Sequence, residues 1–245
     1  TASAAVPATA IPAVAMPAIE LAAGKQVVPM LQPSANPFSA GRYPLGRKYT
    51  VGDSAMFRTR DLLTGIESES RLSTVTNVDL ENDRVEINGG EFLLDSMGNY
   101  LRTPMGGSSD VPQQFFPAEL QVGKAWAAGW KQDNPKFGQE IISFDMRIAA
   151  FEKVRVPAGE FEAFRIEARG WARRSNGSVL REQRFWVVPG LNFTIKLEVI
   201  FKGFGRLIRT DQTELVSLRQ QSIDTRCAIS SDGLKGTLVI RNSCA

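Results

Sequence analysis

Histidine is absent from this sequence of 245 residues, and cysteine occurs only twice. Without histidine the chain has no Ser-His or Cys-His nucleophile pair and no imidazole ligand for a metal ion. It also has no side chain whose unperturbed pKa lies near neutrality. We therefore expect a protein that is not an enzyme, with no catalytic residues, no metal and no cofactor.

The sequence also has no large excess of positive or negative charge and no long uninterrupted hydrophobic run. The net charge is +3 and no dense run of Lys or Arg is present, so the sequence predicts no nucleic-acid binding. The most apolar stretch, residues 1–24, is rich in Ala and is interrupted by Pro7, Pro12 and Pro17. It predicts no transmembrane segment. Since it lacks the basic start of a signal peptide, we expect it to be the beginning of a mature or processed chain.

The two cysteines, Cys227 and Cys244, both lie in the last 19 residues. The segment between them, "AISSDGLKGTLVIRNS", has the pattern of a strand, a Gly-rich turn and a second strand. It predicts a disulfide-closed hairpin over residues 223–245, and the alternative is a pair of free thiols. A disulfide here would stabilise the chain by roughly 3 kcal/mol. It would also indicate an oxidising compartment, either the periplasm or the outside of the cell.

Proline is concentrated near the N-terminus, where seven of the 13 prolines fall in the first 44 residues. Such a composition favours extended or polyproline II backbone over a packed core. We therefore assign residues 1–42 to an extended Ala/Pro-rich arm. This arm is either a linker or a segment that docks on a partner.

From residue 43 onwards, short β-rich runs alternate with turn residues such as "TG", "NGG" and "GN". The clearest run is "EIISFDMRIAA", in which Ile142, Phe144, Met146 and Ile148 share one face. "FRIEARGW" and "NFTIKLEVIF" alternate in the same way. One-sided alternation is typical of antiparallel sheet with one face on a core and one in water. The sequence therefore predicts an all-β fold, an antiparallel meander over residues 43–222 that forms a curved sheet, a half-barrel or a sandwich.

Two stretches of the predicted β domain resemble each other faintly and raise the possibility of an internal duplication. "YPLGRKYTVGDSAMF" and "FPAELQVGKAWAAGW" share an aromatic-Pro opening, followed by Val-Gly and further aromatic residues. Turns and alternating strands follow each of them. The sequence leaves open whether residues 43–222 form one domain or two similar β units, residues 43–110 and 111–222.

"VPAGEF" and "VVPGLNF" have the composition of hairpin turns. Pro157 and Pro189 preset φ for the second turn position, and Gly159 and Gly190 tolerate positive φ. We interpret both as structural turns rather than functional loops. "DLENDR" carries acidic residues at alternate positions but lacks the glycine and the distal glutamate of a calcium-binding loop, so it predicts a polar turn.

Charges of both signs alternate on the predicted outer faces of three strands, at Arg165, Glu167, Arg169, Glu182, Arg184, Lys196 and Glu198. Opposite charges on neighbouring strands pair across a sheet, so we interpret the pattern as a solvated sheet face. The alternative is a catalytic carboxylate pair, Glu167 with Glu182 or Glu198. Neighbouring cations would keep both carboxylates ionised, which disfavours a pair in which one group has to act as an acid.

Four tryptophans are able to stack on a sugar ring or to anchor a partner, and they are the candidate ligand-binding residues: Trp126, Trp130, Trp171 and Trp186. Trp171 and Trp186 fall on the outward register of their strands, beside the charged residues. Packing in the core and exposure on a binding surface both stay open.

The order of "FPAELQVGKAW", "FEKVRVPAGEFEAFRIEARG" and "REQRFWVVPGLNFTIKLE" resembles a pattern in uncharacterised secreted bacterial β-domains. In those domains a Val-Gly-Lys-x-Trp strand precedes a Val-Pro-Ala-Gly-x-Phe hairpin, and an aromatic strand then leads to a Pro-Gly turn. "VGDSAMFRTRDLLTG" and "INGGEFLLDSMGN" are similar to the upstream half of these domains. The resemblance extends from about Tyr43 to Phe201. It implies a periplasmic or envelope-associated β-sheet domain of unknown function, with no catalytic residues.

These observations together predict a non-catalytic extracytoplasmic protein that works by binding or assembly. The leading hypothesis is an accessory subunit of a bacterial envelope or surface complex, which engages a protein partner through residues 1–42. The alternative hypothesis is a carbohydrate- or lipid-binding β module that uses exposed aromatic residues.

Overall fold

The computed structural model describes residues 19–20, 27–28, 43–221 and 238–240. Within these ranges every regular element is a strand, which confirms the predicted all-β fold. The same ranges contain no helix with the length and apolar character needed to cross a membrane. In the large sheet the strands pair antiparallel, with one parallel addition at the start of β13 (Gly159–Arg174), where β17 (Leu238–Ile240) pairs.

Twelve strands form a sheet that closes on itself. The first six follow one another along the chain: β4 (Ser54–Asp61), β5 (Glu67–Asp79), β6 (Arg84–Ile87), β7 (Phe92–Leu94), β8 (Tyr100–Thr103) and β9 (Gly107–Ser109). The second six do the same: β11 (Ala125–Asn134), β12 (Gly138–Val156), β13, β14 (Gly177–Val187), β15 (Lys196–Gly203) and β16 (Arg206–Arg219). Pairing of β9 with β11 and of β16 with β4 closes the ring. The predicted curved meander is confirmed, and it closes into a barrel-like sheet.

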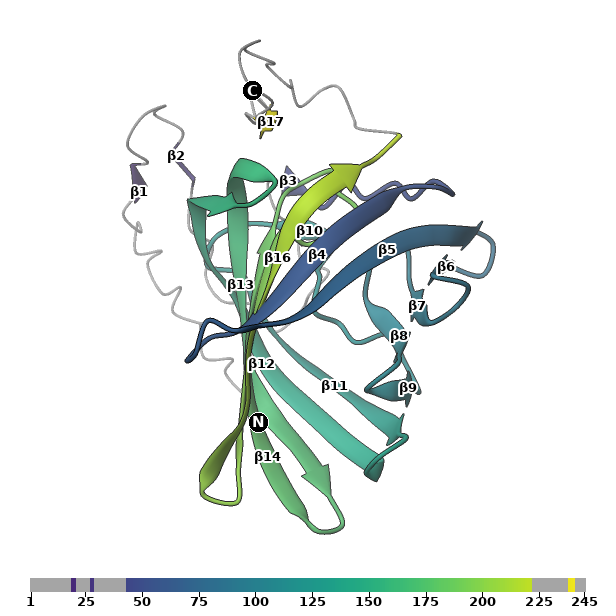
Figure 1. Cartoon of the computed structure of the whole chain (residues 1–245), viewed down its shortest axis with the longest axis vertical. Coiled ribbons are helices and arrows are strands. Elements are labelled where there is room, and N and C mark those ends of the chain that lie inside the picture. The colour runs from purple at the N-terminus through teal and green to yellow at the C-terminus, as the bar shows by residue number, and fades with distance from the viewer. Residues whose placement is uncertain (1–18, 21–26, 29–42, 222–237, 241–245) are drawn as a thin grey trace, which may run out of the picture.

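The closed sheet is strongly twisted. Figure 1 shows the long strands converging near the middle of the molecule and fanning apart on either side of it. Each strand is rotated relative to its neighbour by roughly 20–25°, so long strands accumulate a large twist. β12, with 19 residues, runs the length of this twisted region. A sheet of this shape is saddle-like, and parts of its outer face become concave.

The two halves of the ring begin with the same local structure. In the first half Gly52 N donates to Val75 O at 2.9 Å, and in the second half Gly123 N donates to Ile148 O at 2.9 Å. The two glycines have φ values of +93° and +92°. The segments before them also pair with each other, as β3 (Tyr43–Pro44) and β10 (Glu119–Leu120). The two similar stretches in the sequence therefore occupy equivalent places, each at the start of a six-stranded meander, and the two meanders share one sheet.

The apolar residues that alternate along the long strands fill the interior. Ile142, Phe144, Met146 and Ile148 are all buried, as their alternation predicts. They belong to a hydrophobic cluster built largely by β11–β14, and a second cluster joins β4–β7 to the chain around Leu191. Aromatic pairs bridge distant segments within the first cluster, such as Phe115 with Phe185 and Tyr43 with Phe164. The interior is therefore packed with side chains.

The predicted turns are confirmed. β12 ends at Val156 and β13 begins at Gly159, so "VPAGEF" is the bend between two paired strands. In "VVPGLNF" Leu191 N donates to Val188 O at 3.1 Å, and Gly190 has a φ of +81°. "DLENDR" spans the polar turn between β5 and β6.

Two predictions fall mainly outside the described residues. Of the arm over residues 1–42, the structure describes β1 (Ile19–Glu20) and β2 (Val27–Val28), which pair with each other. Of the hairpin over residues 223–245, it describes β17 alone. Cys227 and Cys244 lie outside the described ranges, and their disulfide stays a prediction.

Candidate functional site

The outer face of β12–β15 carries two rows of charged side chains that follow the register of the sheet. Residues that are direct partners on successive strands form the rows Arg147–Glu167–Arg184–Glu198 and Asp145–Arg169–Glu182. The sign of the charge alternates along each row and between the rows. The predicted pattern of alternating charges on the outer strand faces is confirmed.

Each glutamate in these rows contacts two cations. The pairs are Arg147–Glu167 at 2.6 Å, Arg165–Glu167, Arg184–Glu198 at 3.0 Å, Lys196–Glu198 at 3.0 Å, Arg169–Glu182 at 3.4 Å and Lys202–Glu182 at 3.2 Å. The side chains of Arg147 and Arg169 are 67% and 73% exposed, whereas those of Glu167 and Glu182 are 21% and 28% exposed. The carboxylates therefore form a floor, and the guanidinium groups stand above it.

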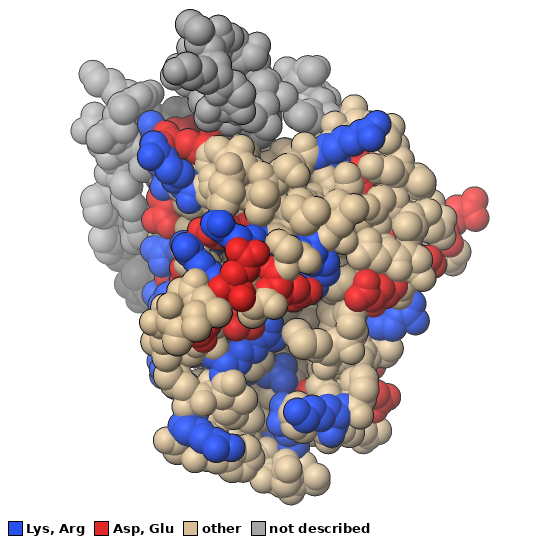
Figure 2. Space-filling view, viewed as in Figure 1, with Lys and Arg blue, Asp and Glu red and all other residues tan. Residues whose placement is uncertain are grey.

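These rows line a hollow that we call the charged groove, with a volume of about 600 Å³. Small-molecule sites typically measure roughly 300–1,000 Å³, so the groove has the size of a ligand site. Its lining consists of Ala125, Asp145, Met146, Arg147, Glu167, Ala168, Arg169, Glu182, Gln183, Arg184, Glu198 and Ile200. Figure 2, a view in which β4, β5 and β16 lie in front as in Figure 1, shows acidic and basic side chains interleaved near the middle of that face, with no large patch of a single sign.

Among the four candidate tryptophans, Trp171 has the exposed ring that ligand stacking requires. It is 45% exposed on the outer face of β13, two residues beyond Arg169. Trp126 and Trp130 are buried in the core on β11, and Trp126 Nε1 donates to Gln114 O at 2.9 Å. The structure thus corrects the assignment of Trp126 and Trp130, because packing leaves neither ring a surface to offer a ligand.

Trp186 has the predicted outward register on β14, but its ring is covered. Its Nε1 donates to Glu152 Oε1 at 2.7 Å, and Lys196 Nζ lies 4.6 Å from the ring centroid. Only 6% of the residue is exposed. Of the two possibilities left open for Trp186, the structure shows packing, because neighbours on β12 and β15 cover the ring, and the assignment of Trp186 as a ligand-binding residue is corrected.

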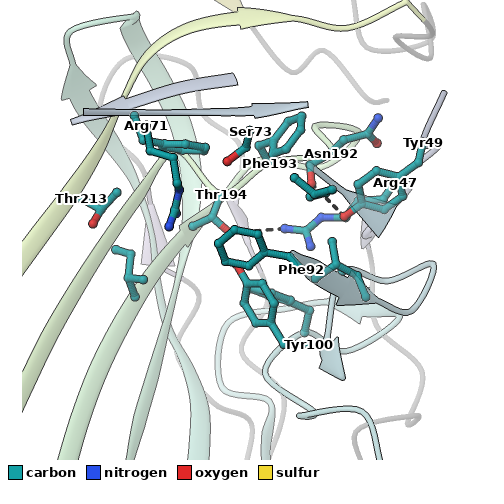
Figure 3. A pocket seen from close by; sticks show the side chains of 16 residues that line it. Arg47, Tyr49, Arg71, Ser73, Phe92, Tyr100, Asn192, Phe193, Thr194 and Thr213 are labelled. Carbon is teal, nitrogen blue, oxygen red and sulfur yellow. Dashed lines mark hydrogen bonds between the residues drawn. The ribbon is translucent and has the colours of Figure 1, made fainter. Parts of the chain in front are cut away.

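A second and smaller hollow, which we call the arginine pocket, has a volume of about 80 Å³. Two arginines, several hydroxyl-bearing residues and a set of apolar side chains line it: Arg47, Tyr49, Phe57, Arg71, Ser73, Ile87, Phe92, Leu94, Gly98, Tyr100, Phe116, Asn192, Phe193, Thr194, Leu197 and Thr213. In Figure 3 Arg71 reaches in from the left of the view and Arg47 from the right. The sequence alternation does not predict this pocket.

Arg47 is held in the pocket by uncharged groups. Its Nη1 donates to Met97 O at 2.8 Å, its Nε to Leu191 O at 3.3 Å and its Nη2 to Thr194 Oγ1 at 3.4 Å. Its guanidinium carbon lies 4.3 Å from the centroid of the Phe116 ring. These contacts fix the orientation of the guanidinium group, and none of the described carboxylates forms an ion pair with it.

Arg71 extends from β5, and its guanidinium carbon lies 4.7 Å from the centroid of the Phe92 ring. Its Nε is buried and has no hydrogen-bond partner within the described ranges. The carboxylate paired with it is that of Glu69, whose Oε1 is 3.9 Å from Nη1, beyond hydrogen-bond distance. The guanidinium fork of Arg71 therefore retains free donors.

Tyr49 lines the same pocket and keeps its proton over a wide pH range. Its hydroxyl donates to Asn192 O at 3.0 Å. Burial raises the pKa of Tyr49 from 10.0 to about 12, and the nearby Arg47 opposes that rise only in part. The phenol is consequently a neutral hydrogen-bond donor at physiological pH.

A buried ion cluster lies elsewhere inside the sheet, around Glu140 on β12. Glu140 is fully buried and accepts hydrogen bonds from Arg174, from Arg181 at 3.2 Å and from the amide of Asn134 at 3.1 Å. Burial lowers the pKa of Arg181, and the contact with Glu140 opposes that effect. Alternation along β12 predicts that residue 140 points to the inner face. It does not predict that two arginines contact the buried carboxylate there.

No site for a metal ion emerges from residues 43–221, where no three Asp, Glu, Cys or His side chains come close enough together. Lys124, from the "VGK" motif, is buried and its Nζ donates to Glu119 O at 3.0 Å. Desolvation lowers the pKa of Lys124. Its contact with β10 gives it a structural place in the second half of the ring.

No protein-family model matches the chain, and no curated protein matches its sequence. Two solved structures are similar to it. A predicted lipoprotein from Parabacteroides distasonis has 15% identity and a TM-score of 0.47, covering 74% of this chain and 100% of its own. A predicted exported protein with a YmcC-like fold from Bacteroides fragilis has 12% identity and a TM-score of 0.44, covering 73% of this chain and 99% of its own.

Proposed function

We propose that this is a non-catalytic, extracytoplasmic binding protein that holds a carbohydrate in the charged groove. The observation that carries the proposal is the groove itself, a hollow of about 600 Å³ in which hydrogen-bond donors and acceptors alternate. A sugar hydroxyl is both a donor and an acceptor, so it can bond to a guanidinium group and a carboxylate at once. Neighbouring strands are about 4.8 Å apart, which spaces these pairs regularly across the groove.

Trp171 supplies an apolar surface next to these polar groups. It follows Arg169 on the same outward face of β13, and its cross-strand partner on β14 is Leu180. An aromatic ring can cover the apolar face of a sugar while charged groups bind the hydroxyls around it. The proposal therefore keeps Trp171 as a ligand-binding residue and adds Arg147, Arg169 and Arg184 as hydrogen-bond donors.

The absence of catalysis is part of the proposal. The chain has no histidine. The acidic residues that a glycoside hydrolase would need, Glu167 with Glu182 or Glu198, lie in the groove, but each contacts two cations. A carboxylate paired in this way is placed to accept hydrogen bonds from the cations beside it. This supports binding over hydrolysis.

The extracytoplasmic location is likewise inferred from the sequence. A hairpin-like segment with one cysteine at each end is typical of proteins that fold in an oxidising compartment. A lipid ligand has less support than a carbohydrate, because an acyl chain needs a far larger apolar hollow than the arginine pocket, whose volume is about 80 Å³.

Carbohydrate binding is tested by screening the full-length protein on a glycan array and measuring the affinity of each hit by calorimetry. We expect Trp171→Ala to weaken binding by about tenfold or more while leaving the melting temperature nearly unchanged, since exposed substitutions usually change stability by less than about 0.5 kcal/mol. Arg184→Gln should weaken binding in the same way. Trp186→Ala is the matched control, because loss of a buried ring should lower the melting temperature. Glycan binding that is unaffected by both groove variants would contradict the proposal, and so would the lack of any hit.

A further inference from the structure

We propose that the arginine pocket is a second binding site, for a compact oxyanion such as a carboxylate or phosphate group. The pocket shares no lining residue with the charged groove. It also contains different chemistry, with two cations over a largely apolar floor instead of alternating charges. The proposal is therefore independent of carbohydrate binding.

The charge balance of the pocket is the first observation that points to an anion. Arg47 and Arg71 both line it, and no Asp or Glu occurs among its described lining residues. Arg71 is partly buried and has the Glu69 carboxylate 3.9 Å away, and two like charges in one partly desolvated hollow disfavour each other. Arg174 and Arg181, by contrast, both contact the buried carboxylate of Glu140. A bound anion would place a negative charge next to Arg47 and a closer one next to Arg71 than Glu69 supplies.

Free donors are the second observation. Arg71 Nε is buried and makes no hydrogen bond within the described ranges, and the nearest carboxylate recorded for this residue is 3.9 Å from Nη1. A guanidinium group presents its N–H donors as a planar fork that matches the two oxygens of a carboxylate or phosphate. The hydroxyl of Ser73 lines the same hollow and can add a donor, and the Thr213 hydroxyl there also pairs with Thr59 Oγ1 at 2.8 Å.

Preorganisation is the third observation. Arg47 is stacked on Phe116 at 4.3 Å and Arg71 on Phe92 at 4.7 Å, so each guanidinium plane is fixed against a ring. Arg47 is held further by two backbone carbonyls. Donors that are already in position lose little conformational entropy when a ligand binds.

The size of the pocket restricts the ligand. An engineered cavity of about 150 Å³ holds a benzene molecule, so a pocket of about half that volume accepts a group of only a few heavy atoms. The Arg71 side chain is 34% exposed, which indicates that the pocket is open on its side. The oxyanion is thus either a small free anion or the end of a longer molecule whose remainder stays outside.

Calorimetric titration of the wild-type protein with four probes tests the proposal and separates these sources. The probes are propionate, inorganic phosphate, octanoate and the neutral isostere propionamide, in a buffer of low ionic strength. We expect at least one of the first three to bind and propionamide not to bind. Binding of propionate but not octanoate indicates a small free acid, binding of both indicates the end of a longer ligand, and binding of phosphate alone identifies a phosphate site.

Variants locate the site. Charge-assisted hydrogen bonds contribute strongly to binding, so Arg71→Gln should weaken the affinity by about tenfold or more. The matched control is Arg155→Gln, which removes one positive charge from a side chain that is 84% exposed and outside the pocket. Trp171→Ala should leave oxyanion binding unchanged, which separates this proposal from the carbohydrate proposal.

A measurement on the unaltered protein covers the case in which the Arg71→Gln chain does not fold. The side-chain Nε–H signal of Arg71 in a ¹H–¹⁵N spectrum should shift when the bound probe is added and should stay in place with propionamide. Lack of binding by all three anions overturns the proposal. The proposal is also overturned if a probe binds, the Nε–H signal of Arg71 does not shift, and Arg71→Gln binds the probe as tightly as the wild type.

Discussion

Glu140 shows how strongly a single residue can matter in this fold. Its carboxylate is fully buried and contacts both Arg174 and Arg181. Removing one partner of a buried ion pair leaves an uncompensated charge, so we expect Glu140→Ala to lower the free energy of unfolding by about 3–5 kcal/mol. Urea denaturation monitored by tryptophan fluorescence measures this loss.

The control for Glu140→Ala is Glu160→Ala on the surface. Glu160 pairs with Arg155 at 3.3 Å, where the Arg155 side chain is 84% exposed. Exposed ion pairs contribute at most about 1 kcal/mol, so the loss at Glu160 should be much smaller. Equal losses for the two variants would show that the buried cluster has no special role in stability.

The raised pKa of Tyr49 predicts that the stability of the folded protein depends on pH at high pH. This pKa is raised from 10.0 in the unfolded chain to about 12 in the folded protein, mainly by burial. A raised pKa means that the folded state favours the protonated form, so this contribution to stability is complete below pH 10 and is lost as the pH rises to about 12.

Titration of tyrosinate absorbance in the wild-type protein should show a late-ionising phase that disappears in Tyr49→Phe. The urea midpoint of the wild type should also fall more steeply above pH 10 than that of the variant. Parallel curves for the two proteins would contradict the assignment.

At the scale of elements, the seam between β9 and β11 is a short junction of the ring that one substitution can test. Two residue pairs join these strands, Gln132 with Ser109 and Asp133 with Ser108. A Cβ atom added to Gly107 would lie 1.7 Å from Asp133 O, and Gly107 has a φ of +73°. We expect Gly107→Ala to open this seam.

Gly138→Ala is the matched control for Gly107→Ala. Gly138 has a φ of +70°, but an added Cβ atom would meet nothing within 4 Å. Gly138→Ala should lower the free energy of unfolding by about 1–2 kcal/mol, because the residue has to keep a left-handed backbone. Gly107→Ala should cost clearly more and should accelerate amide hydrogen exchange in β8, β9 and β11. A similar cost and similar exchange in both variants would show that the seam tolerates the clash.

The sequence predicts single strands and turns well because both depend on nearby residues. The alternation in β12, β13 and β15 identifies their outer charges, and Pro157 and Pro189 mark two turns that the structure contains. Closure of the ring depends on pairing between β4 and β16, which are separated by most of the domain. No local pattern encodes that pairing.

The errors concerning tryptophan have separate physical causes. Trp126 and Trp130 lie in "AWAAGW", where small Ala and Gly neighbours give little contrast between the two faces of the strand. The register of Trp186 was predicted correctly, but its cover comes from Glu152 and Lys196 on adjacent strands. The sequence does not predict the arginine pocket, because its lining comes from segments far apart in the chain. Alternation predicts only the side of the sheet to which Arg71 points.

At the scale of the whole molecule, the hypothesis of a partner bound through residues 1–42 stays a prediction. Isolation from the native source under mild conditions, followed by mass spectrometry, should identify a stoichiometric partner. We expect deletion of residues 1–42 to remove it while the far-UV circular dichroism spectrum of the β-sheet is retained. A chain with a Gly/Ser segment of equal length in place of the arm is the control for chain length. A partner that stays bound to the deleted chain would contradict the hypothesis.

The closed ring also constrains how this chain can be made. β4 pairs with β16 through contacts such as Ser54 with Arg219, so the edge of β4 stays unpaired until β16 has been made. Until β16 arrives, the outer edge of β4 presents unpaired N–H and C=O groups, which are a template for aggregation. Contacts between such distant segments also form slowly. A cell that produces this protein must therefore protect an incomplete sheet for most of the time that the chain takes to emerge.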